Sequence, residues 1–470
     1  MNLARGSILT LAFMLILQTG FGQDKQDTLK LSMAQAQQYA LDNNSNVKSA
    51  KIDVEIAKKK VWETTAIGLP QFTVTADYQH LFNVPEFSFP TTGFTQDPLT
   101  FTGETPQGFQ QFTSTGGLNQ YVYTGPGFPI SPSDNTTFNF TLSQLIFSGE
   151  YIVGLQAARI YKELSVKTSE KTNVSTKESV ATGYNMALVL TENLKILKST
   201  LINLETSLSE VSMMKNQGFM EETDVDQLKI NKSNLETMIR SLEGQKSVAQ
   251  MLLKIQLGVD FDQPIVLTDS INGIIEQANF QYLNSSEFLV DNSIDYQLMK
   301  TNEGLAALSY KREKAKFLPT VSAFYRHQQL ANEPALNFQP KDVIGVSVSL
   351  PIFTSGQRLS TVGQAKLSLE KATLGREYVG QNLTLEFAQA KNDYETAYGN
   401  YQTNKESMAL SEKIYNKNMI KYKEGVATSL ELTQSQTQYL QSESNYYSSV
   451  LSLLNAKAKL ERILTKDENK

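Results

Sequence analysis

The stretch LPIFTSGQ, residues 350–357, ends an alternating apolar run and opens a long segment without proline. A similar stretch, LIFSGE at residues 145–150, does the same in the first half of the chain. In each half a glycine in a polar turn follows 69 residues later, so that Gly218 follows Gly149 and Gly425 follows Gly356. Because both halves make the same transition at the same spacing, the sequence predicts an internal duplication.

Two segments of the chain are permissive for very long helices. None of the 13 prolines lies between Gly149 and Gln263 or after Pro351, and a proline inside a helix removes a hydrogen bond and clashes with the preceding turn. Leucine, with one valine, recurs from Leu190 to Val211 in steps of 4 and 3, which is the pattern of a coiled-coil seam. The sequence therefore predicts long helices that pack as coiled coils.

Each long helix ends in a turn that predicts an antiparallel return helix. The turns read NQGFMEETD and YKEGVATSLE, and each places a glycine where a left-handed residue ends a helix. Thr223 is the expected N-cap of the first return helix, and Thr428 or Ser429 is that of the second. Each half of the chain thus carries one helical hairpin.

Four alternating segments precede the long helices. They read QFTVTADYQ and FNFTLSQLIF in the first half, and TVSAFYRHQ and VIGVSVSLPIF in the second. Alternation at period two gives a strand one apolar and one polar face, and the apolar face fits either a soluble core or lipid. Open strand edges are not tolerated in lipid, so strands that span a membrane need several chains to close a barrel. Two chains would give 8 strands and three would give 12, and the pattern alone does not choose.

Composition excludes several functional classes. The net charge of -5 argues against a nucleic-acid partner. The absence of cysteine excludes disulfides, thiolate metal sites, a cysteine nucleophile and an N-terminal lipid anchor. Residues 1–22 have the basic start, short apolar core and small residues of a cleavable signal peptide. No phosphate-binding loop, hydrolase elbow or Cys/His cluster is present, so we expect neither an enzyme nor a cofactor or metal site.

Three segments together resemble the TolC family of outer-membrane efflux proteins: LSMAQAQQYALDNN near the start, GVSVSLPIFTSGQR, and YKEGVATSLELTQSQTQYLQSESNYY. The resemblance covers nearly all of the mature sequence. It implies a mainly α protein with membrane β: a homotrimer with a long periplasmic α-helical barrel and a shared 12-stranded outer-membrane β-barrel. It also implies a passive conduit of a tripartite efflux pump or type I secretion system, with a periplasmic adaptor and an inner-membrane transporter as partners.

The resemblance and the spacing together predict a duplicated helix–strand–strand–helix–helix unit. The expected boundaries are a signal peptide at 1–22; a first repeat at 23–257, with a helix at 33–67, strands at 70–82 and 136–148, a long helix at 149–217 and a return helix at 221–257; an equatorial insert at 258–292; a second repeat at 293–466, with a helix at 293–317, strands at 319–330 and 342–353, a long helix at 356–424 and a return helix at 428–466; and a tail at 467–470.

In the resembled family the two hairpin turns form a constricted periplasmic tip. Tyr422 matches a tyrosine of that tip, and Glu431 matches the first of its acidic positions. Asp224 is the equivalent acid of the first repeat. We expect Asp224 and Glu431 to form an acidic gate, because rings of carboxylates attract cations.

Other features of the tip bear on this gate. Glu221 and Glu222 lie beside Asp224, but acids in the first turn of a helix also simply favour its positive end. Ala427 replaces a family arginine and Gln434 replaces the second family acid, so the family's closing salt link is in doubt.

Two competing functions come from other classes. A soluble periplasmic coiled-coil scaffold or adaptor without channel activity explains the heptads but not the paired strands. A self-sufficient porin explains the strands but not the long helices. The segment from about Asn83 to Asn135, rich in Gly, Pro, Thr and aromatic residues, is expected to be a large external loop.

Overall fold

The computed structural model describes residues 28–84, 86–88, 90–95, 109–113, 119–124, 128–129, 131–277, 287–333, 337 and 339–465. The predicted signal peptide and tail lie outside these residues. The chain forms two compact units, and each unit contains parts of both repeats. The helical unit comprises Met1–Ile56, Glu163–Asn302 and Thr373–Lys470, and the strand unit comprises Ala57–Lys162 and Glu303–Ala372.

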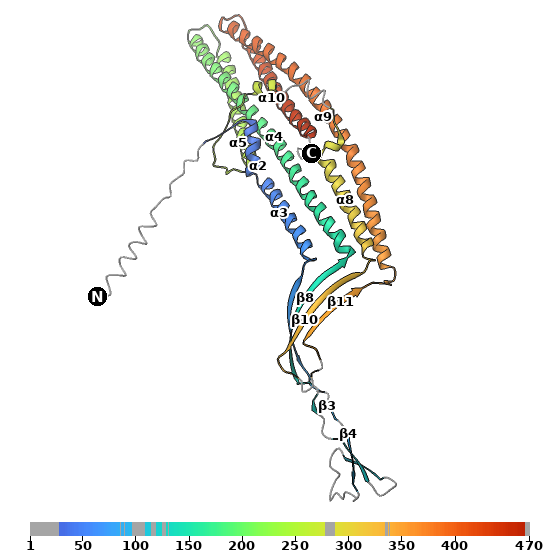
Figure 1. The fold of residues 1–470 in the computed structure, drawn as a ribbon. Coiled ribbons are helices and arrows are strands. Elements are labelled where there is room, and N and C mark those ends of the chain that lie inside the picture. The colour runs from blue at the N-terminus through green and yellow to red at the C-terminus, as the bar shows by residue number, and fades with distance from the viewer. Residues whose placement is uncertain are drawn as a thin grey trace, which may run out of the picture. The chain divides into compact units, whose positions relative to one another are not determined.

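The strand unit is built on a four-stranded antiparallel sheet. Its order is β11-β10-β8-β2, with β2 at Gln71–His80, β8 at Asp134–Ser148, β10 at Thr320–Leu330 and β11 at Asp342–Ser349 (Figure 1). The two hairpin partners of each repeat pair with one another, and β8 pairs with β10 to join the repeats. Strands β2 and β11 are the edges of this sheet.

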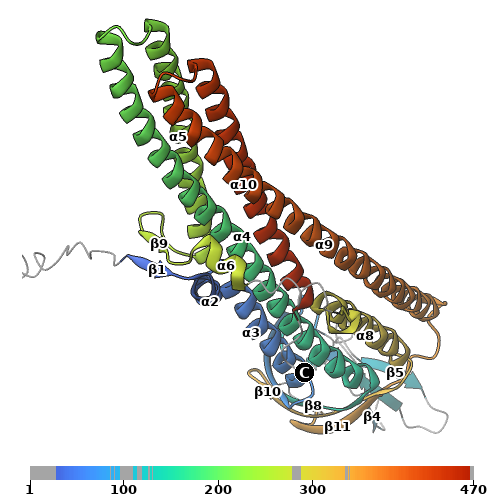
Figure 2. The same cartoon turned by 90° about the horizontal axis from the view of Figure 1, so that it is seen from above.

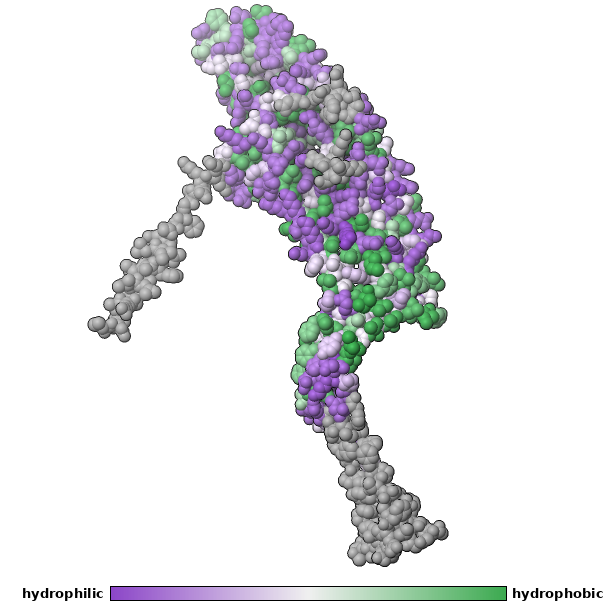
Figure 3. All heavy atoms as spheres, viewed as in Figure 1, coloured by the Kyte–Doolittle hydropathy of each residue, from purple (hydrophilic) through white to green (hydrophobic). Residues whose placement is uncertain are grey.

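The register of the sheet separates an apolar from a polar face. Phe72, Leu142, Tyr325 and Ile344 lie in one row across all four strands, and their exposed fractions are 67%, 43%, 44% and 84%. The adjacent row runs from Thr73 through Thr141 and Arg326 to Val343 on the other face. On the side drawn in Figure 3, hydrophobic residues gather over the strands and the helix ends that join them. The apolar face is therefore exposed in the single chain.

The helical unit contains two long hairpins, which run side by side in Figures 1 and 2. The first consists of α4, Gly149–Asn216, and α5, Glu222–Leu257. The second consists of α9, Gln357–Lys423, and α10, Ser429–Leu464. Both long helices begin in the strand unit and continue into the helical unit. Their ends differ by no more than two residues from the expected ends, because proline, glycine and capping residues mark them in the sequence.

Leucines of the first hairpin and tyrosines of the second form a common core near the turns. Leu197, Leu204 and Leu235 are buried there beside Tyr415 and Tyr422. A second cluster, around the insert, collects apolar residues from the N-terminus, both hairpins and α6. The predicted coiled-coil seam is thus the core of the helical unit.

The single helix expected at 33–67 is wrong, since two helices occupy this segment: α2 at Met33–Asn43 and α3 at Ser45–Ala66. Asn44 lies between them with ψ 133°, and its side-chain amide donates to the carbonyl of Gln256 at 2.7 Å. Its Oδ1 accepts the backbone N–H of Asn46 at 2.8 Å, which caps α3. Gly258 ends α5 at φ 73°, where a Cβ would lie 2.4 Å from the carbonyl oxygen of Asn43. The break therefore arises where the chain docks on the end of α5.

The predicted insert pairs with the N-terminal segment. Strand β1, Leu29–Leu31, is parallel to β9, Ile265–Leu267, and α6 follows at Ile271–Gln277. The buried Tyr184 hydroxyl of α4 donates to the Leu31 carbonyl at 3.0 Å and lies 3.1 Å from an Asp269 carboxylate oxygen. A 3-10 turn, η1 at Val290–Asn292, leads into α8 at Ile294–Ala315.

Short strands lie within the segment that was expected to be an external loop. Strand β3, Glu86–Phe87, pairs with β7, Phe128–Pro129. Strand β6, Asn119–Thr124, lies between β4, Pro90–Thr95, and β5, Phe109–Thr113. Among the described residues, no helix combines the length and low polarity that crossing a bilayer requires.

Candidate functional site

The two hairpin turns have the same backbone geometry. Gly218 and Gly425 adopt φ of 81° and 72°, in the left-handed region that favours glycine. The N–H of Phe219 bonds the Met214 carbonyl at 3.0 Å, and the N–H of Val426 bonds the Lys421 carbonyl at 2.8 Å. Each turn thus closes its long helix with the pattern of a Schellman motif. The turns expected at Gly218 and Gly425 are present in both repeats; that they form a periplasmic tip stays a prediction.

The two predicted gate acids occupy equivalent capping positions. The backbone N–H of Glu221 donates to Asp224 at 3.2 Å, and that of Thr428 donates to Glu431 at 2.9 Å. The Thr428 hydroxyl accepts the N–H of Glu431 at 3.2 Å in return. Both carboxylates therefore cap the start of a return helix. This is the purely structural role that was the alternative to a gate. No contact between described residues joins Asp224 directly to Glu431.

The other predicted tip residues divide into exposed acids and a buried tyrosine. Glu221 and Glu222 are exposed, and Glu222 lies 3.5 Å from Lys215 of α4. Tyr422 is buried in the core between the hairpins, and its hydroxyl has no hydrogen-bond partner. Burial, and secondarily the charge of Asp224, raises the pKa of Tyr422 to about 12. Tyr422 therefore belongs to the packing of the tip rather than to its exposed acids.

The expected N-cap Thr223 is wrong. Glu221 precedes α5 as its N-cap, and Thr223 lies inside the first turn, where its hydroxyl donates to Glu221 at 3.2 Å. The reason is that the chain after Gly218 reaches helical geometry two residues earlier than a Thr223 cap would allow. Thr428, in contrast, is confirmed as the N-cap of α10.

Two links between the hairpins were not found from the sequence. The Lys423 ammonium of α9 lies 2.7 Å from a Glu210 carboxylate oxygen of α4. The Asn231 amide of α5 donates to the Thr433 hydroxyl of α10 at 3.0 Å. Ala427 packs against the apolar core. Among the described residues, the Lys423–Glu210 ion pair is the charged link between the two hairpins near these turns. No local sequence pattern predicts contacts between residues that lie about two hundred positions apart.

A buried carboxyl group lies further along α10. Glu443 is 1% exposed, and neither of its carboxylate oxygens has a hydrogen-bond partner among the residues that the structure describes. Burial, and secondarily the charge of Glu412 on α9, raises the pKa of Glu443 to about 8. An ionised carboxylate is costly in such surroundings, so this side chain is mostly neutral at pH 7.

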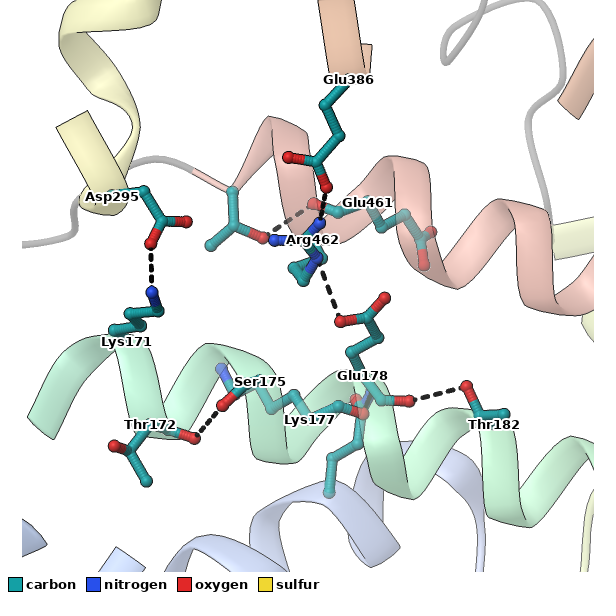
Figure 4. A network of polar contacts seen from close by, with 12 residues as sticks. Lys171, Thr172, Ser175, Lys177, Glu178, Thr182, Asp295, Glu386, Glu461 and Arg462 are labelled. Atoms are coloured by element: carbon teal, nitrogen blue, oxygen red, sulfur yellow. Dashed lines mark hydrogen bonds and ion pairs between the residues drawn. The ribbon is translucent and has the colours of Figure 1, made fainter. Parts of the chain in front are cut away.

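Arg462 joins three helices at the other end of α10 (Figure 4). Its Nε lies 3.0 Å from Glu178 of α4, and its Nη2 contacts Glu386 of α9. Burial raises the pKa of Glu178, and the Arg462 charge partly opposes that rise. Lys171 of α4 pairs nearby with Asp295 of α8 at 2.6 Å. The pairs Arg462–Glu178 and Lys171–Asp295 link the first repeat to the second.

The two histidines occupy matched positions in the duplicated hairpins. His80 Nδ1 lies 2.8 Å from Asp134, and His327 Nδ1 lies 2.7 Å from Asp342. In the part of the chain that the structure describes, no group of three or more His, Asp or Glu side chains is arranged to hold a metal. Each pair instead ties the two strands of its hairpin together across the register.

Known proteins share this fold and part of this sequence. Residues 291–466 match the family model described as outer membrane efflux protein. The fold matches CusC, the subject of a study of folding and transmembrane channel formation, with a TM-score of 0.71 and 14% identity over 94% of each chain. It matches VceC of Vibrio cholerae with a TM-score of 0.67 and 15% identity over 92% of this chain and 96% of the other. It matches the open-state MtrE channel of Neisseria gonorrhoeae with a TM-score of 0.67 and 15% identity, over 92% of this chain and 88% of the other. A comparison with curated protein sequences found no match.

The fold is therefore that of the solved structures of CusC, VceC and the MtrE outer-membrane channel. The match to the outer membrane efflux protein family covers residues 291–466, most of the second repeat. The predicted fold class and the resemblance to this family are confirmed.

Proposed function

We propose that this chain is the outer-membrane channel subunit of an export machine, either a tripartite efflux pump or a type I secretion system. It acts as a passive conduit for small molecules or proteins and assembles as a homotrimer. A cleavable signal peptide carries it across the inner membrane, and no lipid anchor is attached. Its partners are a periplasmic adaptor and an inner-membrane transporter.

The exposed apolar face of the four-stranded sheet is the observation that carries this proposal. Phe72 and Val74 on β2, and Ile344, Val346 and Val348 on β11, are each more than half exposed. Such a face is costly in water and favourable against hydrocarbon, at about 25 cal/mol per Å². The opposite face carries Thr73, Thr141 and Asn139, as expected of a water-filled lumen.

The two edge strands support a shared barrel. In lipid, the unpaired backbone groups of β2 and β11 need partners. Three copies of the sheet, joined edge to edge, supply 12 strands and leave no edge. The long helices then continue from the barrel into the periplasm, since a helix of 68 residues is about 100 Å long.

The scaffold alternative does not account for this sheet. A soluble coiled-coil adaptor has no use for an apolar face of this exposure, and it has no need to protect two sheet edges. The matched length of the two hairpins fits either function, so the strand unit distinguishes them.

Cysteine pairs across the proposed seam test the trimer directly, because the chain has no native cysteine. Thr75→Cys on β2 is combined with Ser347→Cys on β11, and Thr73→Cys replaces Thr75→Cys in a second pair to cover the alternative spacing. Oxidation in membranes should give a covalent trimer in at least one pair, while each single cysteine stays monomeric in SDS. Monomers in both pairs, together with release of the protein by a carbonate wash, would favour the scaffold.

At the tip we propose that Asp224 and Glu431 act as a cation-attracting constriction, with Glu221, Glu222 and Tyr422 around them. The capping bonds occupy part of each carboxylate, yet the Glu431 side chain stays exposed. Rings of such groups raise the local cation concentration.

Single-channel recording of Glu431→Ala tests this constriction. We expect weaker cation selectivity and weaker block by polyvalent cations. Glu424→Ala is the matched control, because it removes an equal charge from an exposed side chain at the same turn. If Glu431→Ala and the wild type have equal cation selectivity, Glu431 acts only as a helix cap.

A further inference from the structure

A groove on the helical unit has a composition that neither the fold nor the proposed conduit requires. It has a volume of ≈ 1010 Å³ and is lined by α6, α9 and α10. Its lining combines tyrosine rings with carboxylates. A volume of this size suits a drug-sized molecule.

The aromatic part of the groove is a continuous chain of four rings. Tyr398 and Tyr401 have ring centroids 6.5 Å apart, Tyr401 and Tyr446 are 6.1 Å apart, and Tyr446 and Tyr447 are 5.2 Å apart. Tyr401 and Tyr447 are buried and Tyr398 and Tyr446 are half-buried, so the rings are held in place by packing. Ring faces of this kind attract cations and pack against apolar groups at the same time.

The charged part of the groove is mainly acidic. Glu276, Glu406 and Glu412 line it, and all three are exposed. None of them forms an ion pair with a described residue. The groove also holds one cation of its own, since the Lys405 ammonium lies 5.6 Å from the centroid of the Tyr401 ring. That lysine lies on an aromatic face although three carboxylates line the same groove, so the face of Tyr401 already contacts a positive charge.

A further acid lies behind this wall. Glu443 is buried on α10 beside Glu412 and Tyr447, both of which line the groove. Its carboxylate oxygens have no hydrogen-bond partner among the described residues. Because Glu443 is mostly neutral at pH 7, the acidic residues of the groove are Glu276, Glu406 and Glu412, and Lys405 is the one basic residue among the described residues of its lining.

We propose that this groove is a binding site for an organic cation, with the cationic centre between the tyrosine faces and the carboxylates of Glu406 and Glu412. An aromatic or alkyl body would cover Tyr398 and Tyr446. Lys405 competes with the ligand for the Tyr401 face. The site does not depend on the proposed conduit, and it gives the chain a preference among small molecules that a purely passive wall lacks.

The test uses two ions of equal shape and opposite charge, tetraphenylphosphonium and tetraphenylborate. Binding is measured by isothermal titration calorimetry on the full protein in neutral detergent, with the heat of empty micelles subtracted. We expect the phosphonium to bind at least tenfold more tightly than the borate.

Variants assign this preference to the groove. Glu406→Gln combined with Glu412→Gln should weaken phosphonium binding by at least tenfold, and Lys405→Met should strengthen it several-fold. Glu395→Gln is the matched control: it changes an exposed glutamate on the same helix outside the groove and should bind as wild type. Circular dichroism melting shows whether each variant is folded.

Two results would overturn the proposal: borate bound as tightly as phosphonium, or unchanged phosphonium binding in the folded double variant. Should the double variant fail to fold, Lys405→Met decides in its place, since unchanged binding there contradicts the competition at Tyr401. Bilayer conductance is recorded on the same samples. A protein that conducts but does not bind the cation rejects the groove alone, whereas one that binds but does not conduct rejects the conduit alone.

Discussion

The two helical hairpins share one backbone plan but differ in what holds them together. The turn glycines Gly218 and Gly425 are 207 residues apart, and so are the first residues of α5 and α10. At this same spacing, buried leucines of the first hairpin correspond to buried serines of the second. The pairs are Leu204 and Ser411, Leu228 and Ser435, and Leu235 and Ser442.

Tyrosine takes over much of the seam in the second hairpin. Tyr394, Tyr401, Met408, Tyr415 and Tyr422 follow one another at intervals of seven on α9. The four tyrosines are buried, yet the hydroxyls of Tyr415 and Tyr422 have no hydrogen-bond partner among the described residues. The two hairpins therefore share helix length and turn geometry, while the residue types of their seams differ. We expect the first hairpin to be the more cohesive one near the turns.

Truncation of matched seam positions should have the largest effect. Leu235→Ala removes a side chain that is 1% exposed and should lower the free energy of unfolding by about 2 to 5 kcal/mol. Its counterpart Ser442→Ala removes one hydroxyl and should change that free energy by less than about 1 kcal/mol. Denaturant unfolding followed by circular dichroism measures both. Equal losses would mean that the two seams are equally cohesive.

The buried acid of the second hairpin should make stability depend on pH. Glu443→Gln should raise the free energy of unfolding by about 2 to 4 kcal/mol at pH 9 and by less than about 1 kcal/mol at pH 4. The folded-state pKa is raised from the ordinary 4.5 to about 8. The contribution of Glu443 to the free energy of unfolding is therefore fully present below pH 4.5 and is lost progressively as the pH rises to about 8.

Burial, and then the charge of Glu412 on α9, oppose the ionisation of Glu443. The phenols of Tyr439 and Tyr447 on α10 also lie near Glu443, and Glu192 of α4 acts on Tyr447. The control is Glu236→Gln, at the matched position on α5. It should show no such pH dependence, because Glu236 is partly exposed and pairs with Lys232. A constant difference between Glu443→Gln and wild type from pH 4 to pH 9 would contradict the buried, unpaired state of Glu443.

The helix caps offer a smaller contrast between the hairpins. Thr428→Ala removes the hydroxyl that accepts the Glu431 N–H and should cost about 1 kcal/mol of stability. Thr223→Ala in the first hairpin removes a hydroxyl that caps nothing and should cost less than about half of that. Thermal melting of the two variants side by side measures the difference, and the reverse order would restore Thr223 as the cap.

Removal of a single hydroxyl should have opposite signs at two tyrosines. Tyr415→Phe removes a hydroxyl without a partner and should raise stability by up to about 1 kcal/mol. Tyr184→Phe removes a hydroxyl bonded to Leu31 and Asp269 and should lower stability by about 1 kcal/mol. A loss of stability in both variants would indicate that the Tyr415 hydroxyl is satisfied in the protein.

Local signals in the sequence predicted most of the architecture. Proline-free runs, heptads and turn glycines place the hairpins, because these features act within a few residues of the helix ends that they determine. Alternation likewise placed the four strands. The break at Asn44 was missed because it depends on docking against Gln256, more than two hundred residues away. The same holds for Lys423 and Glu210, and for the hub at Arg462, whose partners come from helices of both repeats.

The candidate gate was predicted only in part. Asp224 and Glu431 were recognised as equivalent acids, but the sequence did not show that both carboxylates accept capping bonds. A first-turn acid has the same local pattern whether it caps a helix, lines a pore or does both. Which carboxylates of a trimer face one another depends on the packing of subunits, which a single chain does not encode locally.

Recording from planar bilayers tests the central claim most directly. Purified mature protein, added in detergent to one side of a bilayer, should insert and give discrete conductance steps with a preference for cations. A protein that leaves the bilayer electrically silent, and that stays monomeric and water-soluble without detergent, would contradict the account of a trimeric outer-membrane conduit.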